Sequence, residues 1–178
     1  MSVVLTTNIF TCEIELGLNE NSALAENFLK LVANDQFTNI LLKYVPHSFF
    51  AFSPSKIERI SEFLTPFTSE SWSVDSIDNE CVLFLFSSNP VTFGISLGLQ
   101  TGILEENQAP IIGKVTFTSE NGAKILDEHK CNENFDPIPA LVLKQTTVTY
   151  NPFAMNHVKS TFEEQIVTKK SFTLLNQS

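Results

Sequence analysis

The sequence predicts a mainly β fold of a single domain, either a barrel or a sandwich. The chain has 178 residues, of which 43% are hydrophobic, and it contains 16 Phe. A chain of this length can bury roughly 70% of its unfolded surface in one core. Short strand-like segments recur along it, whereas helical patterns are few. Many short strands with few helices are typical of β-barrels and β-sandwiches.

The first predicted elements are a strand, a turn and a helix. Residues 10–16 alternate between apolar and polar side chains, which is the pattern of a half-buried strand. Residues 19–21 then form a turn. Ser22 is a suitable N-cap for a helix over residues 23–33, whose apolar side chains recur on one face.

The remaining elements are mostly strands. They are predicted at residues 39–44, 49–52, 81–86, 93–97, 113–118 and 143–150. Besides the helix at residues 23–33, a helix is predicted at residues 119–129. A capped amphipathic helix is also predicted from Ser53 to Phe63. Because the Phe-rich strands have consecutive apolar residues, we expect one face to fill a barrel and the other to lie beneath a helix.

The charge and hydropathy of the chain argue against RNA and membrane binding. The net charge is −9, and the 11 Lys and Arg are scattered, whereas strong binding of phosphates needs clustered cations. The longest apolar run, residues 82–86, is far shorter than the roughly 20 residues of a membrane-spanning helix. The amino-terminal segment also lacks the features of a signal peptide. We therefore expect no strong direct RNA binding, no membrane binding and no export.

The cysteines and histidines form no recognisable site. Three widely spaced Cys fit neither a disulfide framework nor a zinc motif, so we expect a reducing compartment, the nucleus or the cytosol. The three His lie far apart and outside metal-binding motifs. We expect no metal and no cofactor.

Three segments in order resemble the cyclophilins. Residues 25–29 read Ala-Glu-Asn-Phe-Leu, residues 39–46 read Asn-Ile-Leu-Leu-Lys-Tyr-Val-Pro, and residues 111–117 read Ile-Ile-Gly-Lys-Val-Thr-Phe. In cyclophilins an Ala-Glu-Asn-Phe helix follows the first strand, and similar segments frame the active site. The resemblance implies a closed eight-stranded antiparallel barrel capped by two helices, formed by residues 1–153, with a C-terminal tail at residues 154–178.

The same resemblance implies a degenerate peptide-binding groove. Cyclophilins lower the prolyl isomerisation barrier, about 18–20 kcal/mol, with an arginine fork beside an apolar pocket. Matched to that site, Lys43 stands for the arginine, and its planar bidentate donor is lost. The other matched groove positions are Ser48, Phe49, Ala51, Phe93, Gly94, Leu104 and Ala109, of which Gly94 replaces the phenylalanine of the pocket wall. These differences predict that the chain is not an enzyme and has a degenerate isomerase site.

Further segments resemble one branch of the family, the spliceosome-associated cyclophilins of the Cwc group. They are Ile-Ser-Leu-Gly at residues 95–98, Gly-Lys-Val at residues 113–115, and Asn151-Pro152-Phe153 after the last strand. The resemblance implies a nuclear, catalytically inactive protein-binding module that acts as a pre-mRNA splicing factor in the activated spliceosome. It implies a helical-repeat partner of the initiation-factor middle-domain type.

Two alternatives to this function stay open. One is an active peptidyl-prolyl cis-trans isomerase with an unusual site. The other is a cyclophilin-like scaffold or chaperone in another cytosolic assembly.

The tail carries a candidate partner-binding segment. Phe162 and Ile166, with Val167, have the spacing of a short helix with one apolar face in an otherwise polar stretch. We expect these residues, together with Asn151-Pro152-Phe153, to add contacts to a partner.

Overall fold

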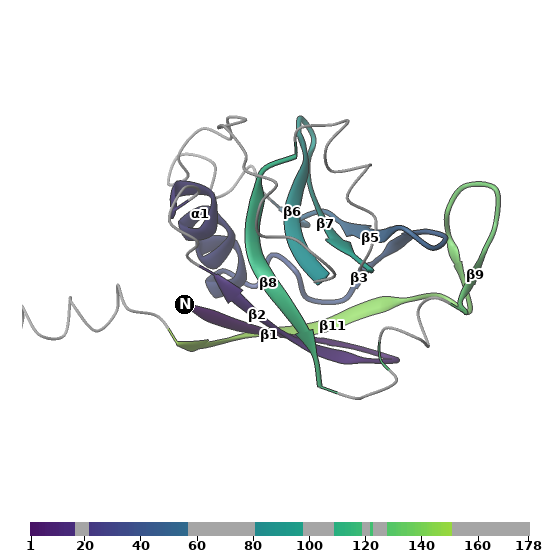
Figure 1. Ribbon diagram of the computed structural model, residues 1–178, viewed down its shortest axis with the longest axis horizontal. Helices are drawn as coiled ribbons and strands as arrows, with labels where there is room; N and C mark the ends of the chain where they lie inside the picture. The colour runs from purple at the N-terminus through teal and green to yellow at the C-terminus, as the bar shows by residue number, and fades with distance from the viewer. Residues whose placement is uncertain (17–21, 57–80, 98–108, 119–121, 123–127, 151–178) are drawn as a thin grey trace, which may run out of the picture.

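The computed structural model describes residues 1–16, 22–56, 81–97, 109–118, 122 and 128–150 (Figure 1). In this part of the chain nine strands form one antiparallel sheet in the order β3-β11-β1-β2-β8-β6-β7-β5-β4, and β9 and β10 pair separately. The elements are β1 (Ser2–Thr7), β2 (Thr11–Leu16), α1 (Ser22–Ala33), β3 (Ile40–Leu41), β4 (Lys43–Val45), β5 (Phe49–Phe52), β6 (Cys81–Ser88), β7 (Val91–Ser96), β8 (Ile111–Phe117), β9 (Lys130–Cys131), β10 (Pro137–Ile138) and β11 (Val142–Tyr150).

The sheet curves into a nearly closed barrel because its two edge strands are consecutive in the sequence. β3 pairs with β11 and β4 pairs with β5, and Leu42 alone separates β3 from β4. The backbone N–H of Leu42 donates to the carbonyl of Leu141 at 2.9 Å. With β3 and β4 counted as the two halves of one predicted strand, the nine strands become eight. The predicted antiparallel barrel is therefore confirmed.

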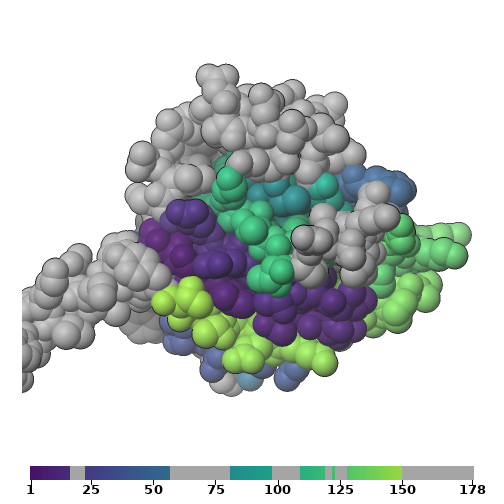
Figure 2. Space-filling model, turned by 60° about the horizontal axis from the view of Figure 1, so that its bottom comes forward, coloured from purple at the N-terminus to yellow at the C-terminus, as the bar shows by residue number. Residues whose placement is uncertain are grey.

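The order of the strands is visible on the molecular surface. Figure 2 shows the purple amino-terminal strands between the yellow-green β11 and the teal β8. This arrangement follows the pairing of β1 with β11 and of β2 with β8. The first and last strands of the described chain are thus neighbours, so the barrel is assembled from both ends of the sequence.

An aromatic cluster joins the helix to the barrel interior. The ring of Phe28, on α1, lies with its centroid 5.0 Å from that of Phe93 on β7 and 5.3 Å from that of Phe37. The Phe37 ring in turn lies 5.3 Å from that of Phe52 on β5. All four side chains are buried. Most of these rings meet edge to face, a geometry that adds to the stabilisation from burial.

Gly113 allows β8 to lie close to β2. A Cβ atom at this position would lie 2.6 Å from the backbone oxygen of Glu15 and 3.1 Å from side-chain atoms of Ile14 and Leu16. Any larger residue would push the two paired strands apart. The Gly-Lys-Val segment of the sequence analysis therefore has a packing role at its glycine.

The predicted strands agree closely with the described ones, with some differences. β1 was not predicted, although its burial alternates along the strand, and the two-residue strands β9 and β10 were not predicted either. The predicted strand at residues 39–44 is interrupted at Leu42. Most of the predicted helices at residues 53–63 and 119–129 lies outside the described residues, and Ser53–Lys56 is not helical. Among the helices that can be described, none has the length and apolar character to cross a membrane.

Candidate functional site

Three of the predicted groove residues lie in one row across the outside of the barrel. Lys43 on β4 pairs with Ala51 on β5, and Ala51 pairs with Gly94 on β7. Gly94 pairs in turn with Phe84 on β6. Directly opposed residues of neighbouring antiparallel strands share a face of the sheet. We call Lys43, Ala51, Gly94 and Phe84 the outer row.

An apolar cluster surrounds this row and is separate from the barrel core. We call it the outer cluster, and its buried members are Phe49, Ala51, Val82, Phe84, Ala109 and Ile111. The ring of Phe49 lies 5.6 Å from that of Phe84 and 5.2 Å from that of Phe86. Phe84 is 1% exposed, whereas Phe86 is 46% exposed. The outer cluster is thus packed inside the structure, with one ring reaching the surface at its edge.

Phe84 provides the aromatic ring that was expected to be missing at Gly94. A Cβ atom on Gly94 would lie 2.3 Å from Cζ of Phe84, so the ring lies directly on the glycine. The space over Gly94 is therefore filled by a buried ring from the neighbouring strand. Phe84 was not among the predicted site residues because the groove positions were matched to the cyclophilin site one at a time. The strand pairing, which sets Phe84 opposite Gly94, is the signal that identifies it.

Two other predicted groove residues lie differently. Phe93 is fully buried in the barrel core, on the opposite face of β7 from Gly94, so we remove it from the groove set. Ser48 is 5% exposed, in the turn between β4 and β5, and its backbone N–H donates to the carbonyl of Val45. Its Oγ has no hydrogen-bond partner and is one of two such buried side-chain atoms in the described chain.

The remaining predicted site residues lie outside the described part of the chain. They are Leu104 of the groove and Asn151, Pro152, Phe153, Phe162 and Ile166 of the tail. The predictions for them, and the division at residue 153, stay predictions.

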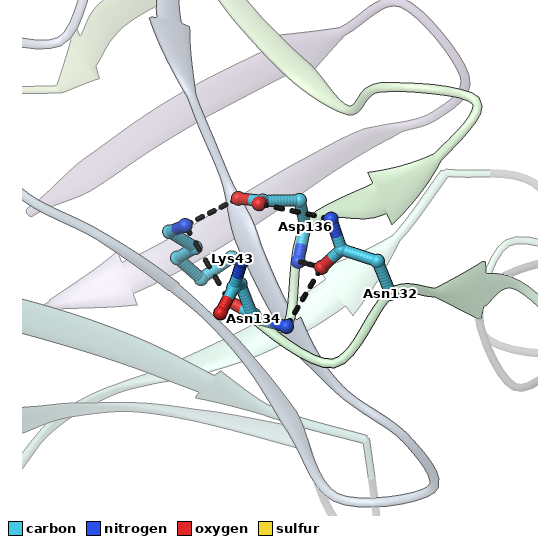
Figure 3. A network of polar contacts seen from close by, with 4 residues as sticks. All are labelled: Lys43, Asn132, Asn134 and Asp136. Carbon is cyan, nitrogen blue, oxygen red and sulfur yellow. Dashed lines mark hydrogen bonds and ion pairs between the residues drawn. The ribbon is translucent and has the colours of Figure 1, made fainter.

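Lys43, at the end of the outer row, forms an ion pair (Figure 3). Its Nζ donates to Oδ1 of Asp136 and lies 3.5 Å from the backbone oxygen of Asn134. Asn132 Nδ2 donates to the other Asp136 oxygen at 3.1 Å. The pKa of the Asp136 carboxyl is lowered, chiefly by the hydrogen bond from Lys43 and next by the hydrogen bond from Asn132. Lys43 is therefore held by a partner while its side chain stays 55% exposed.

The described part of the chain has no cluster of metal-ligating side chains and three free thiols. No group of three or more His, Cys, Asp or Glu side chains in it could hold a metal ion. Cys12, Cys81 and Cys131 are free thiols. Burial raises the pKa of Cys12 to about 12 and also raises that of Cys81. Both thiols are therefore protonated at neutral pH.

Comparisons with solved structures identify the fold as cyclophilin-like. A cyclophilin-type peptidyl-prolyl cis-trans isomerase from Cryptosporidium parvum, solved in the presence of the dipeptide Ala-Pro, matches with a TM-score of 0.67 and 18% identity, over 85% of this chain and 100% of that one. A second structure of a C. parvum cyclophilin-type isomerase matches with a TM-score of 0.67 and 19% identity, over 85% of this chain and 98% of that one. A cyclophilin from Hirschia baltica matches with a TM-score of 0.54 and 10% identity, over 85% of this chain and 75% of that one. No protein-family model and no curated protein matches the sequence.

These matches correct one prediction. The prediction that the chain is not an enzyme is contradicted because the matching C. parvum structures are peptidyl-prolyl cis-trans isomerases. The degenerate site was predicted from single positions, whereas in the structure the Phe84 ring lies on Gly94 and Asp136 holds Lys43.

Proposed function

We propose that this chain is a cyclophilin-like peptidyl-prolyl cis-trans isomerase that works in the nucleus within a pre-mRNA splicing assembly. The observation that supports the catalytic part is the outer row together with the exposed Phe86 beside it, which set a held cation and an accessible aromatic ring on one face of the barrel. The row also contains two small residues, Ala51 and Gly94. A prolyl peptide offers matching groups, a carbonyl oxygen for the cation and an apolar ring for the aromatic edge.

The chemistry that such a site performs needs no covalent step. Rotation about the prolyl bond breaks the conjugation between the nitrogen and its carbonyl, which is the origin of the barrier of roughly 18–20 kcal/mol. A positioned N–H donor near the twisted amide stabilises it relative to the planar forms. Each reduction of the barrier by about 1.4 kcal/mol raises the rate tenfold. In this proposal Lys43 is the donor, and Phe86, at the exposed edge of the outer cluster, contacts the proline ring.

The test is a cis-trans isomerisation assay with a tetrapeptide that contains an alanyl-prolyl bond. We expect the full chain to accelerate the exchange above its uncatalysed rate, and Lys43→Met to remove most of that acceleration. Lys144→Met is the matched control, because Lys144 is an exposed lysine on β11, outside the strands of the outer row. An exchange rate equal to the uncatalysed one with the unmodified chain would refute the catalytic proposal.

The splicing part of the proposal is supported by the order of the sequence motifs, above all Asn151-Pro152-Phe153 after the last strand. The proposed partner is a helical-repeat splicing factor of the initiation-factor middle-domain type. The net charge of −9 favours a protein contact over a contact with RNA. A scaffold role in a cytosolic assembly is the competing reading.

Affinity purification from nuclear and cytosolic extracts distinguishes these two assemblies. Splicing proteins should co-purify with the full chain, and a chain ending at residue 153 should retain fewer of them if the tail adds contacts. Purification of an unrelated cytosolic complex alone would contradict the splicing role while leaving the isomerase proposal intact.

A further inference from the structure

The loop between β9 and β10 has a polar network that ends on the lysine of the outer row (Figure 3). Oδ1 of Asn132 accepts hydrogen bonds from the backbone N–H groups of Asn134 and Asp136, each at 2.9 Å. The backbone N–H of Asn132 also donates to the carbonyl of Asp136 at 3.0 Å. These bonds close the loop on itself. Asn132 Nδ2 also donates to Oδ2 of Asp136 at 3.1 Å, which directs the carboxylate from within the loop.

The same loop is tied to the strand that carries Lys43. The backbone N–H of Tyr44, the next residue on β4, donates to the carbonyl of Phe135 at 2.9 Å. Tyr44 is fully buried in the barrel core, so this attachment point is itself well anchored. Asp136 and Lys43 are therefore held close together by the backbone on both sides of the ion pair.

The ion pair contributes little to the stability of the fold. The side chains of Lys43 and Asp136 are 55% and 48% exposed, and exposed pairs of this kind are weakly stabilising. Its effect on the position of the ammonium group is larger. A lysine side chain is flexible, and a second anchor restricts where its charge lies.

From this geometry we infer that Asp136 is a positioning residue for Lys43 in the proposed isomerase site. An ammonium group has three N–H donors. Asp136 Oδ1 and the carbonyl of Asn134 take two of them, which leaves one for the carbonyl oxygen of a bound prolyl peptide. The carboxylate that the loop directs gives the flexible lysine part of the directionality that an arginine fork has by its own shape. This inference rests on the proposed function.

A double-mutant cycle on the full chain tests the inference, with the alanyl-prolyl tetrapeptide as the probe. The four proteins are the unmodified chain, Asp136→Asn, Lys43→Met and the double variant. Asparagine keeps a side-chain oxygen that can accept from Asn132 Nδ2, and its backbone N–H can still donate to Asn132 Oδ1, so the loop should stay closed while the charge is lost. Glu133→Gln is the matched control, because it removes an exposed carboxylate from the same loop.

We expect Asp136→Asn to lower kcat about two- to fivefold, the range for an exposed ion pair, with KM nearly unchanged. The same substitution in the Lys43→Met background should have no effect, and Glu133→Gln should be neutral. A loop that matters only for folding would lower the activity equally in both backgrounds. That result, or an active chain in which Asp136→Asn is neutral, would overturn the inference alone. A chain without turnover would overturn the proposed function and, with it, this inference.

Discussion

The packing of the outer cluster can be tested by removing the ring of Phe84 on β6 and restoring a ring at Gly94, its partner on β7. Phe84 is 1% exposed, and its ring lies directly on Gly94, its cross-strand partner. Phe84→Ala should destabilise the fold by about 3–5 kcal/mol, the usual cost of deleting a buried Phe. For a chain of this size that loss lowers the melting temperature by roughly 6–20 °C. Gly94→Phe alone should cost about 1–3 kcal/mol or more by overpacking, because an added Cβ would lie 2.3 Å from Cζ of Phe84.

The double variant Phe84→Ala with Gly94→Phe should recover part of this loss. It returns one ring to the same space from the neighbouring strand, so the two changes should couple favourably by up to about 3 kcal/mol. Urea unfolding followed by fluorescence or circular dichroism measures the four free energies. Phe86→Ala with Gly94→Phe is the control, because Phe86 is 46% exposed and does not oppose Gly94. If the two changes add within about 0.5 kcal/mol, Phe84 and Gly94 do not share one space and the reasoning is wrong.

Three further predictions follow from other residues. Gly113→Ala should lower the free energy of unfolding by about 1–3 kcal/mol, because its Cβ would lie 2.6 Å from the Glu15 carbonyl oxygen; an unchanged urea midpoint would contradict this. The lowered pKa of Asp136 stabilises the fold at pH values above the unfolded pKa of about 3.9, and this contribution is lost as the pH falls through the lower folded value. Asp136→Asn should therefore weaken the dependence of the melting temperature on pH between pH 5 and pH 2. Glu133→Gln keeps the ion pair and should leave its contribution to that dependence in place. Cys12, with a pKa of about 12, should resist alkylation at pH 8 in the folded chain and react on unfolding; rapid native labelling of Cys12 would contradict its burial.

Alternation and apolar runs predicted most of the strands because they report burial directly, whereas the choice of a barrel over a sandwich came from the family resemblance. The strand at residues 10–16 and the Phe-rich strands β5 and β6 were found at nearly the right positions for this reason. β9 and β10 were not predicted, since each is two residues long and too short to show any period.

The candidate site was predicted less completely because it depends on pairing between distant segments. Lys43, Ala51 and Gly94 were identified from a family resemblance, position by position. Phe84 belongs to the row only because β6 pairs with β7 in one register. Asp136 lies 93 residues from Lys43 in the sequence, and no local pattern indicates that the two meet. A side chain of one strand that occupies the space beside a residue of the paired strand cannot be predicted until the register of the two strands is known.

The single-residue link at Leu42 has a consequence for the orientation of the site. Exposure alternates through the link without interruption: Leu41 is 70% exposed, Leu42 is 2% exposed, Lys43 is exposed and Tyr44 is fully buried. The two half-strands therefore behave as one continuous ribbon that exchanges its partner from β11 to β5 at Leu42. An extra residue inserted there would reverse the parity of the ribbon, turning Lys43 toward the barrel interior and Tyr44 toward solvent. The length of this link determines which face of the barrel carries the cation.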